Sequence, residues 1–319
     1  MRSRITAVFV VAFVALGVAL TAHAQARPKW NIRIDNSPYV YGLYAKGPIR
    51  TPDVTTPLGK EAVTEILAGP TNGSTEGYLM FTRMPSGAHG PALFTLPDEH
   101  FFIVLEGTMN LQIGTDKFVL NKFEGAFIPA NTPHEVWNDG AGEERHFEVV
   151  APGSSRDLLS MVKPAQARAV PDAATLIRKP TIPPAAGLPA GLNGAQFAST
   201  MTGAKIQFRM DSCRPGRCGP PTHVHKFQQV YFETEGETTV EYGLLTYKLP
   251  KYSLVVIQPG VVHTNRNDST AVERHVTLLM PQLTNGESAD IEYERVDRPA
   301  QAPGQAPAGG GRGRGAATP

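Results

Sequence analysis

The sequence predicts an all-β chain that contains two similar domains. Apolar residues occur in short runs, such as Phe101–Leu105 and Leu254–Ile257, and Gly, Pro and Asn separate the runs. Many short strand-like runs with regular turn signals are typical of β-sandwiches and barrels. The second half of the chain also repeats the first at a fixed offset, which indicates duplicated structural units. The 319 residues are enough for two domains with cores of their own.

The internal repeat has an offset of 129 positions and needs no gap. His134 corresponds to His263, because 263 − 134 = 129, and Glu144-Arg145-His146 corresponds to Glu273-Arg274-His275. The same offset relates Gly90-Pro91 to Gly219-Pro220, Glu106-Gly107 to Glu235-Gly236, Gly114 to Gly243, Leu120 to Leu249, Ile128 to Ile257, and Asn138-Asp139 to Asn267-Asp268. A register this long is poorly explained by chance.

The strand-like runs and the composition divide the chain into five parts. Residues 1–24 read as a signal peptide, and residues 25–162 as an N-terminal arm followed by a first, degenerate domain. Residues 163–191 are rich in Pro and Ala and are expected to form a linker, with a short helix near Asp172–Arg178. Residues 192–298 form the second domain, and residues 299–319 are expected to be a disordered Pro/Gly/Ala tail.

The N-terminus predicts export from the cytosol. Arg2 and Arg4 precede an apolar run from Ile5 to Leu20, and Ala22-His23-Ala24 offers a small-residue cleavage site. A membrane anchor is the competing interpretation, but the run is short for a spanning helix. We therefore expect a periplasmic or secreted protein that has no membrane contact after cleavage.

The charge balance and the two cysteines give information about the partner and the compartment of the protein. The 30 basic and 29 acidic residues nearly cancel, so nothing in the charge indicates a nucleic-acid partner. The two cysteines, Cys213 and Cys218, are expected to form a disulfide across the Arg-Pro-Gly-Arg turn in an oxidising compartment. This disulfide would fix the loop that leads to His223. A redox pair or soft copper ligands remain open as alternatives.

A histidine pattern in the second repeat predicts a metal site. His223 and His225 lie one residue apart on an extended segment, so their side chains project to the same side. Gln229 follows shortly after, and His263 arrives on a later strand after Pro259-Gly260. Three imidazoles and an amide oxygen aimed into one cavity are a ligand set for a transition metal.

The order His-x-His, x3, Gln, then Gly236, then Pro-Gly-x-x-His resembles the two sequence motifs of the cupin superfamily. The usual residue at position 229 of that pattern is Glu, so this chain departs from it at one ligand. The resemblance implies two tandem cupin jelly rolls (double-stranded β-helices), that is, a bicupin similar to quercetin-dioxygenase-like proteins.

The first repeat lacks most of this ligand set. Phe94 and Leu96 stand where the second repeat has its His-x-His pair, and only His100 and His134 remain as possible ligands of a weak second site. We expect Phe94, Leu96 and Phe102 to be core residues and His89 to be a surface residue. His146 and His275 alternate with apolar neighbours, so both are expected to face away from the cavities.

The neutral ligand set affects which metal the site prefers and which residue could act as a general base. Four neutral ligands leave the full charge on the ion, and imidazole-rich surroundings favour copper, nickel, zinc or iron over manganese. With the metals available in a periplasm, we rank copper first, then iron, then zinc, with nickel and manganese less favoured. Gln229 cannot accept a substrate proton as a Glu ligand can. Glu233 and Tyr231 share the strand parity of Gln229 and are the candidate catalytic residues, and Glu241 is a weaker one.

The resemblance implies an O2-dependent, dioxygenase-like oxidoreductase that acts on phenolic or similar small molecules. Copper-dependent oxidative cleavage of polysaccharides is an alternative, although only Trp30 and Trp137 are present to stack on sugars. A non-redox isomerase, hydrolase or lyase that uses the ion as a Lewis acid is another. A binding protein without turnover is the third. The chain is expected to be a monomer or a homo-oligomer, and its partner a small-molecule or saccharide substrate.

Overall fold

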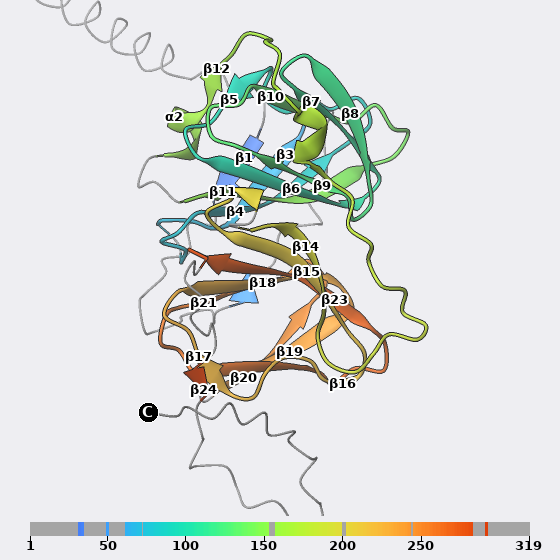
Figure 1. Cartoon of the computed structure of the whole chain (residues 1–319), viewed down its shortest axis with the longest axis vertical. Coiled ribbons are helices and arrows are strands. Elements are labelled where there is room, and N and C mark those ends of the chain that lie inside the picture. Colours follow the sequence, from blue (N-terminus) through green and yellow to red (C-terminus); the bar gives the residue numbers. More distant parts are fainter. Residues whose placement is uncertain are drawn as a thin grey trace, which may run out of the picture.

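The computed structural model describes residues 31–34, 49–50, 61–71, 73–152, 157–199, 202–243, 245–282 and 291–292. The two β-domains lie one above the other, with the N-terminal domain at the top of Figure 1. The expected signal peptide at 1–24 and the tail at 299–319 lie outside the described residues. In the described part of the chain, no helix has the length and apolar character needed to cross a membrane.

The N-terminal domain has a larger sheet, β1-β3-β4-β11-β6-β9-β13, and a smaller sheet, β12-β5-β10-β7-β8. Their bounds are β1 (Asn31–Ile34), β3 (Val63–Ala68), β4 (Tyr78–Met84), β5 (Phe94–Thr95), β6 (Glu99–Glu106), β7 (Thr108–Ile113), β8 (Asp116–Asn121), β9 (Gly125–Ile128), β10 (His134–Trp137), β11 (Glu144–Ala151), β12 (Lys163–Pro164) and β13 (Ile177–Arg178). The short helix α2 (Leu158–Met161) packs its Leu158 and Met161 side chains into this domain.

The C-terminal domain repeats this arrangement with the sheets β14-β15-β23-β18-β21-β2 and β20-β19-β22-β17-β24, and β16 pairs with β22. Their bounds are β2 (Ile49–Arg50), β14 (Asn193–Ala198), β15 (Gln207–Cys213), β16 (Gly216–Arg217), β17 (His223–Val224), β18 (Gln228–Glu235), β19 (Glu237–Tyr242), β20 (Leu245–Pro250), β21 (Leu254–Ile257), β22 (His263–Asn267), β23 (Glu273–Met280) and β24 (Ile291–Glu292). The expected all-β fold with two tandem jelly rolls is therefore confirmed.

The 129-residue repeat is also a repeat of strand register. His134 pairs with Phe94 in the first domain, and His263 pairs with His223 in the second. The Asn138 side-chain amide donates to the Met84 carbonyl at 2.7 Å, and Asn267 donates to the Cys213 carbonyl at 3.0 Å. These two asparagines hold equivalent turns. The sequence repeat therefore corresponds to a repeated structure.

The largest apolar core lies between the two domains, where their larger sheets pack face to face. Phe81, Phe147 and Phe232 belong to it, and the Phe147 and Phe232 rings stack at 4.1 Å between centroids. Polar side chains frame this core, since Lys122 of the first domain pairs with Glu235 of the second. The equivalent Lys251 pairs with Glu106 at 2.7 Å, so the interface has a local twofold character.

The segments outside the repeats also pack on the domains. Strand β2, from the N-terminal arm, adds to β21 of the C-terminal domain. Within the expected linker, β12 pairs with β5 and β13 pairs with β9, both in the N-terminal domain. The helix expected near Asp172–Arg178 is a single 3-10 turn, η1 (Ala173–Leu176).

Candidate metal centre

Three strands bring the predicted ligand residues together inside the C-terminal barrel. His223 opens β17, Gln229 lies near the start of β18, and His263 opens β22 opposite His223. His225 lies in the short segment between β17 and β18. All four side chains are buried. The alternation that places His223 and His225 on one side of an extended segment therefore operates as expected.

The ligand atoms converge on one point. The His223 and His225 Nε2 atoms lie 3.2 Å apart, His225 Nε2 lies 3.0 Å from Gln229 Oε1, and His263 Nε2 lies 2.8 Å from the same oxygen. The three histidines can hold a metal ion through one nitrogen each.

Backbone carbonyls fix the tautomers of two of these histidines. His223 Nδ1 lies 2.7 Å from the Pro221 carbonyl, and His263 Nδ1 lies 2.8 Å from the Val261 carbonyl. A carbonyl only accepts, so both Nδ1 atoms carry a proton, and in a neutral imidazole the lone pair is then on Nε2. Such contacts orient histidine ligands in metal sites.

The arrangement is electrostatically incomplete without a cation. The lone pair of His263 Nε2 faces the amide oxygen of Gln229, and both atoms are acceptors. Burial, and next the neighbouring His223, lower the pKa of His263 to about 3, so a proton does not relieve this repulsion at neutral pH. A metal ion bound to both atoms would relieve it. The residues present therefore fit a mononuclear metal with three nitrogen ligands and one oxygen ligand.

A cavity of about 160 Å³ opens beside the ligands. Its lining consists of Leu192, Gln207, Arg209, Pro220, His223, His225, Gln229, Tyr231, Asn265, His275, Thr277 and Leu279. Phe227 is buried, and its ring stacks on His225 at 4.6 Å between centroids. It therefore supports a ligand and does not line the cavity.

His275 faces this cavity, so the expectation that it points away was wrong. The apolar neighbours Val276 and Leu278 belong to the core between the domains, and this places His275 and Thr277 on the inner face of the barrel. His146 likewise lines the cavity of the N-terminal domain, because Phe147 and Val149 face the inter-domain core.

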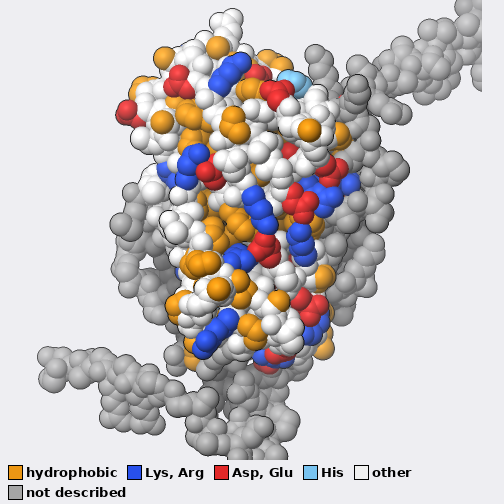
Figure 2. All heavy atoms as spheres, turned by 90° about the vertical axis from the view of Figure 1, so that its right-hand side faces the viewer, with side chains coloured by type: hydrophobic (Ala, Val, Ile, Leu, Met, Phe, Trp, Pro, Cys, Tyr) orange, Lys and Arg blue, Asp and Glu red, His pale blue; other side chains and the backbone are white. Residues whose placement is uncertain are grey.

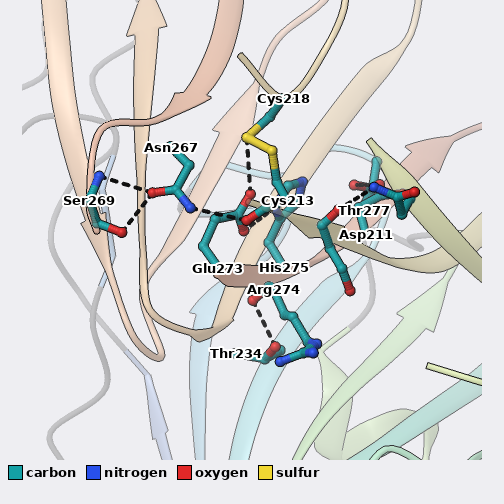
Figure 3. A network of polar contacts seen from close by, with 12 residues as sticks. Asp211, Cys213, Cys218, Thr234, Asn267, Ser269, Glu273, Arg274, His275 and Thr277 are labelled. Atoms are coloured by element: carbon teal, nitrogen blue, oxygen red, sulfur yellow. Dashed lines mark hydrogen bonds and ion pairs between the residues drawn. A yellow bond between two sulfur atoms is a disulfide. The ribbon is translucent and has the colours of Figure 1, made fainter. Parts of the chain in front are cut away.

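A buried network of charged groups surrounds His275 (Figure 3). Its Nδ1 lies 2.8 Å from Glu273 Oε2, and the neighbouring Thr277 hydroxyl donates to Asp211 at 2.5 Å. Arg209 Nε donates to the same Asp211 oxygen at 2.9 Å. Burial alone would lower the pKa of His275, but the charge and hydrogen bond of Glu273 raise it above its usual value. Its Nε2 atom has no hydrogen-bond partner among the described residues.

The candidate catalytic residues differ in their access to the cavity. Tyr231 lines it, and its ring contacts His275 edge-on at 4.9 Å. Glu233 is fully buried and is not among the lining residues; burial, and next the charge of Glu273, raise its pKa well above the ordinary value. Glu241 accepts from Arg266 at 2.6 Å and is also outside the lining. Only Tyr231 of the three can touch a ligand in this cavity.

Cys213 and Cys218 form the expected disulfide, which joins β15 to the loop before His223 (Figure 3). Cys218 Sγ lies 3.4 Å from Glu273 Oε1. The disulfide therefore contacts the network around His275 and also restrains the loop that leads to the ligands.

The N-terminal barrel has a hydrogen-bonded chain where the C-terminal barrel has its ligands. His134 Nδ1 faces the Thr132 carbonyl at 2.8 Å, and its Nε2 lies 3.0 Å from His100 Nδ1. His100 Nε2 in turn lies 2.9 Å from Glu148 Oε2. Although burial opposes it, the hydrogen bond of His100 and nearby charges lower the pKa of Glu148 to about 2. His100 thus lies between His134 and Glu148 and contacts one with each ring nitrogen.

The residues around this chain are apolar, as the sequence predicts. Phe94, Leu96 and Phe102 are buried and line a cavity of about 40 Å³. The Phe94 ring lies 4.4 Å from the His134 ring, at the position that His223 has in the other barrel. His89 is exposed and stacks on Trp137 at 6.2 Å, as expected of a surface residue.

Sequence reasoning missed four residues of the cavity and its floor: Arg209, Asp211, Asn265 and Thr277. A usable signal was the parity of β15, where Arg209 and Asp211 alternate with apolar Phe208 and Met210. Polar residues at every second position of a buried strand indicate a polar barrel interior.

Comparisons with known proteins bear on the fold of the chain. The Cupin domain family matches residues 80–150, within the N-terminal barrel. A search among curated proteins found no match to the sequence.

Similar solved structures include protein Ylba from E. coli, with a TM-score of 0.53 and 12% identity over 72% of this chain and 89% of that one. The putative glyoxylate induced protein from Pseudomonas aeruginosa has a TM-score of 0.53 and 12% identity, over 70% and 82% of the two chains. Oxalate decarboxylase from Bacillus subtilis, described with Mn(II) centres, has a TM-score of 0.51 and 12% identity over 68% and 71%. At these identities the likeness concerns the fold. The match to the Cupin domain family covers part of the N-terminal barrel, and the chain as a whole is similar in fold to these solved structures.

Proposed function

We propose that this protein is a metal-dependent enzyme with one mononuclear site, formed by His223, His225, Gln229 and His263. The observation that carries the proposal is the approach of unprotonated acceptors in the second barrel, with 2.8 Å between His263 Nε2 and Gln229 Oε1. In the first barrel His100 stands where the second has Gln229 and is already hydrogen-bonded to His134 and Glu148, so we propose that this barrel holds no metal and has a structural role.

The reaction that we propose is a dioxygenase-like oxidation of a small molecule. Bound in this site, a redox-active divalent metal would supply a coordination position for substrate and O2 chemistry. Four neutral ligands favour a high reduction potential, and imidazole ligands suit copper or iron more than manganese. Insertion of both atoms of O2 into the substrate balances the electrons without an external reductant. This chain's residues would orient the substrate and exclude water.

The size of the cavity favours a small molecule over a polymer. Its volume of about 160 Å³ is comparable to that of a cavity that encloses a benzene ring. The lining is mostly buried, so a polysaccharide chain has no open groove at this site. Oxidative cleavage of polysaccharides is therefore the weaker candidate.

A non-redox lyase or isomerase is the second candidate, because the cavity contains an acid–base pair. Glu273 holds His275 at 2.8 Å, and His275 reaches the cavity. A histidine whose Nδ1 is held by a carboxylate can move a proton at Nε2. Such a reaction would need the ion only as a Lewis acid.

Oxygen consumption separates the two candidates. The full chain, loaded with copper or iron, should consume O2 in the presence of a phenolic or carboxylic substrate panel, and His263→Ala should abolish this. Turnover that persists without O2, or that is equally fast with zinc, would contradict the oxidative proposal and support the Lewis-acid class.

We also propose that the protein acts outside the cytosol. The disulfide between Cys213 and Cys218 supports this, because disulfides persist mainly in oxidising compartments. Cleavage of residues 1–24 in exported protein, measured by intact mass, tests it.

A further inference from the structure

The cavity beside the metal ligands contains buried polar atoms that have no hydrogen-bond partner among the described residues. Asn265 is 2% exposed, and neither its amide nitrogen nor its oxygen has a partner among the described residues. His275 is fully buried, and its Nε2 atom is also without a partner there. Unmade hydrogen bonds of buried groups are costly, so groups of this kind indicate a ligand.

Gly219 makes room for Asn265. A Cβ atom at position 219 would lie 2.2 Å from Asn265 Oδ1, so no side chain fits there without moving the amide. The Gly219-Pro-Pro segment that precedes the ligands therefore leaves space for a polar group that points into the cavity.

Arg209 adds a positive charge to the same cavity. Its Nε atom donates to Asp211 at 2.9 Å, and its side chain is 30% exposed. Asp211 also accepts from Thr277, so it is held from two sides and fixes the guanidinium in turn. Because Arg carries five N–H donors, the bond from Nε leaves its terminal nitrogens able to hold a carboxylate.

We infer that the cavity binds a small organic carboxylate, whose anionic group is held by Arg209, Asn265 and His275 while the rest of the molecule faces the metal ligands. The inference rests on the proposed function for the metal and deepens it by naming the substrate class. Leu192 and Leu279 also line the cavity and can contact an apolar part of the molecule.

The charges that face His275 set the pH dependence of this binding. Glu273 contacts its Nδ1 atom, Asp211 and Arg209 lie on β15 beside it, Tyr231 contacts its ring, and Glu233 lies opposite it on β18. With Nδ1 bonded to Glu273, His275 donates from Nε2 only in its doubly protonated form. Carboxylate binding should therefore weaken as the pH rises through the pKa of His275, which lies above its usual value.

Calorimetry with matched ligands tests the inference. The metal-loaded full chain is titrated with pyruvate and benzoate, and with pyruvamide and benzamide, which keep the shape but lack the charge. The carboxylates should bind about tenfold or more tightly than the amides, which corresponds to one charge-assisted hydrogen bond. Arg209→Gln should remove this preference, and Arg209→Lys should retain part of it.

Arg266→Gln is the matched control. Arg266 lies in the same domain and carries the same charge, but it pairs with Glu241 at 2.6 Å outside the cavity. This variant should keep the preference for carboxylates. Metal content is measured on every sample, so loss of metal and loss of anion binding are distinguished.

Equal binding of the carboxylates and amides to metal-loaded protein would overturn the inference and leave the proposed metal function standing. A preference that survives in Arg209→Gln would also overturn it. Conversely, carboxylate binding by a protein that takes up no metal would support the anion site and contradict the proposed function.

Discussion

At the scale of single residues, Gln229 is the residue that would set the charge of the proposed metal centre. A glutamate at this position would add a negative charge at the point where the three Nε2 atoms converge, whereas the amide adds none. The spacing of His223, His225 and His263 was enough to predict which side chains meet. The positions of His275 and Arg209 in the cavity lining were not predicted, because neither residue belongs to the metal-ligand motif in the sequence.

Gln229→Glu should shift the metal preference toward manganese. The carboxylate lies where Gln229 Oε1 now contacts His225 at 3.0 Å and His263 at 2.8 Å, so it attracts the ion directly. We expect Mn²⁺ affinity to rise about tenfold or more, from Coulomb attraction at short range. Competition titration against a chelator measures this. Unchanged Mn²⁺ affinity would argue against Gln229 as a ligand.

At the scale of elements, polar and apolar residues alternate along β11 and β23, and either face of each strand could point into its barrel. Sequence shows that His275 and Thr277 lie on one face and Val276 and Leu278 on the other. It favours the apolar face as the inside of a barrel. In the structure the apolar face packs against the second domain, because two sheets must bury a common interface. Tertiary packing between repeats, which no local pattern shows, therefore determines which residues reach the cavities.

The interface between the repeats should depend on its aromatic core far more than on its ion pairs. Phe232 is fully buried and stacks on Phe147 at 4.1 Å, so Phe232→Ala should lower the free energy of unfolding by about 3–5 kcal/mol. Lys251 and Glu106 pair at 2.7 Å with side chains that are 44% and 37% exposed, so Lys251→Gln should cost less than about 1 kcal/mol. Urea denaturation of both variants measures the difference, and comparable losses would refute this ranking.

At the scale of the whole molecule, the two barrels differ in the side chains at equivalent places. In the first, His100 lies between His134 and Glu148, and in the second, Gln229 lies beside His225 and His263, where we propose a metal. The whole sequence has nearly equal numbers of basic and acidic residues. On the face shown in Figure 2, basic and acidic side chains lie interspersed. The sequence repeat predicted the duplicated fold and the loss of the His-x-His pair. It did not predict Glu148 as the partner of His100, because that contact joins β6 to β11.

The stability of the metal-free protein should fall as the pH is lowered below 6.5. Burial, and next His100, lower the pKa of His134 to about 3, so between these values the unfolded chain binds a proton that the folded chain does not. The stabilisation is fully present above pH 6.5 and is lost as the pH falls toward 3. At pH 5 the loss from this residue is about 2 kcal/mol, that is, 1.5 pH units at 1.36 kcal/mol each.

Urea denaturation at pH 7.5 and pH 5 checks this for the wild type and for His134→Gln, in which the difference between the two pH values should shrink by about that amount. His89→Gln, at an exposed position, should leave the difference unchanged. An unaltered pH dependence in His134→Gln would show that this histidine is not held neutral.

The number of metal ions per chain tests the central claim most directly. Elemental analysis is made on the full chain, exported without added metal, and on the equivalent variants His263→Ala and His134→Ala. We predict about one metal per chain in the wild type and in His134→Ala, and none in His263→Ala. The second barrel brings three histidines and Gln229 together with ligand atoms 2.8–3.2 Å from one another, whereas the first barrel has Phe94 and Leu96 in place of His223 and His225. Metal retained in His263→Ala, or lost in His134→Ala, would contradict the assignment of the centre to the C-terminal barrel.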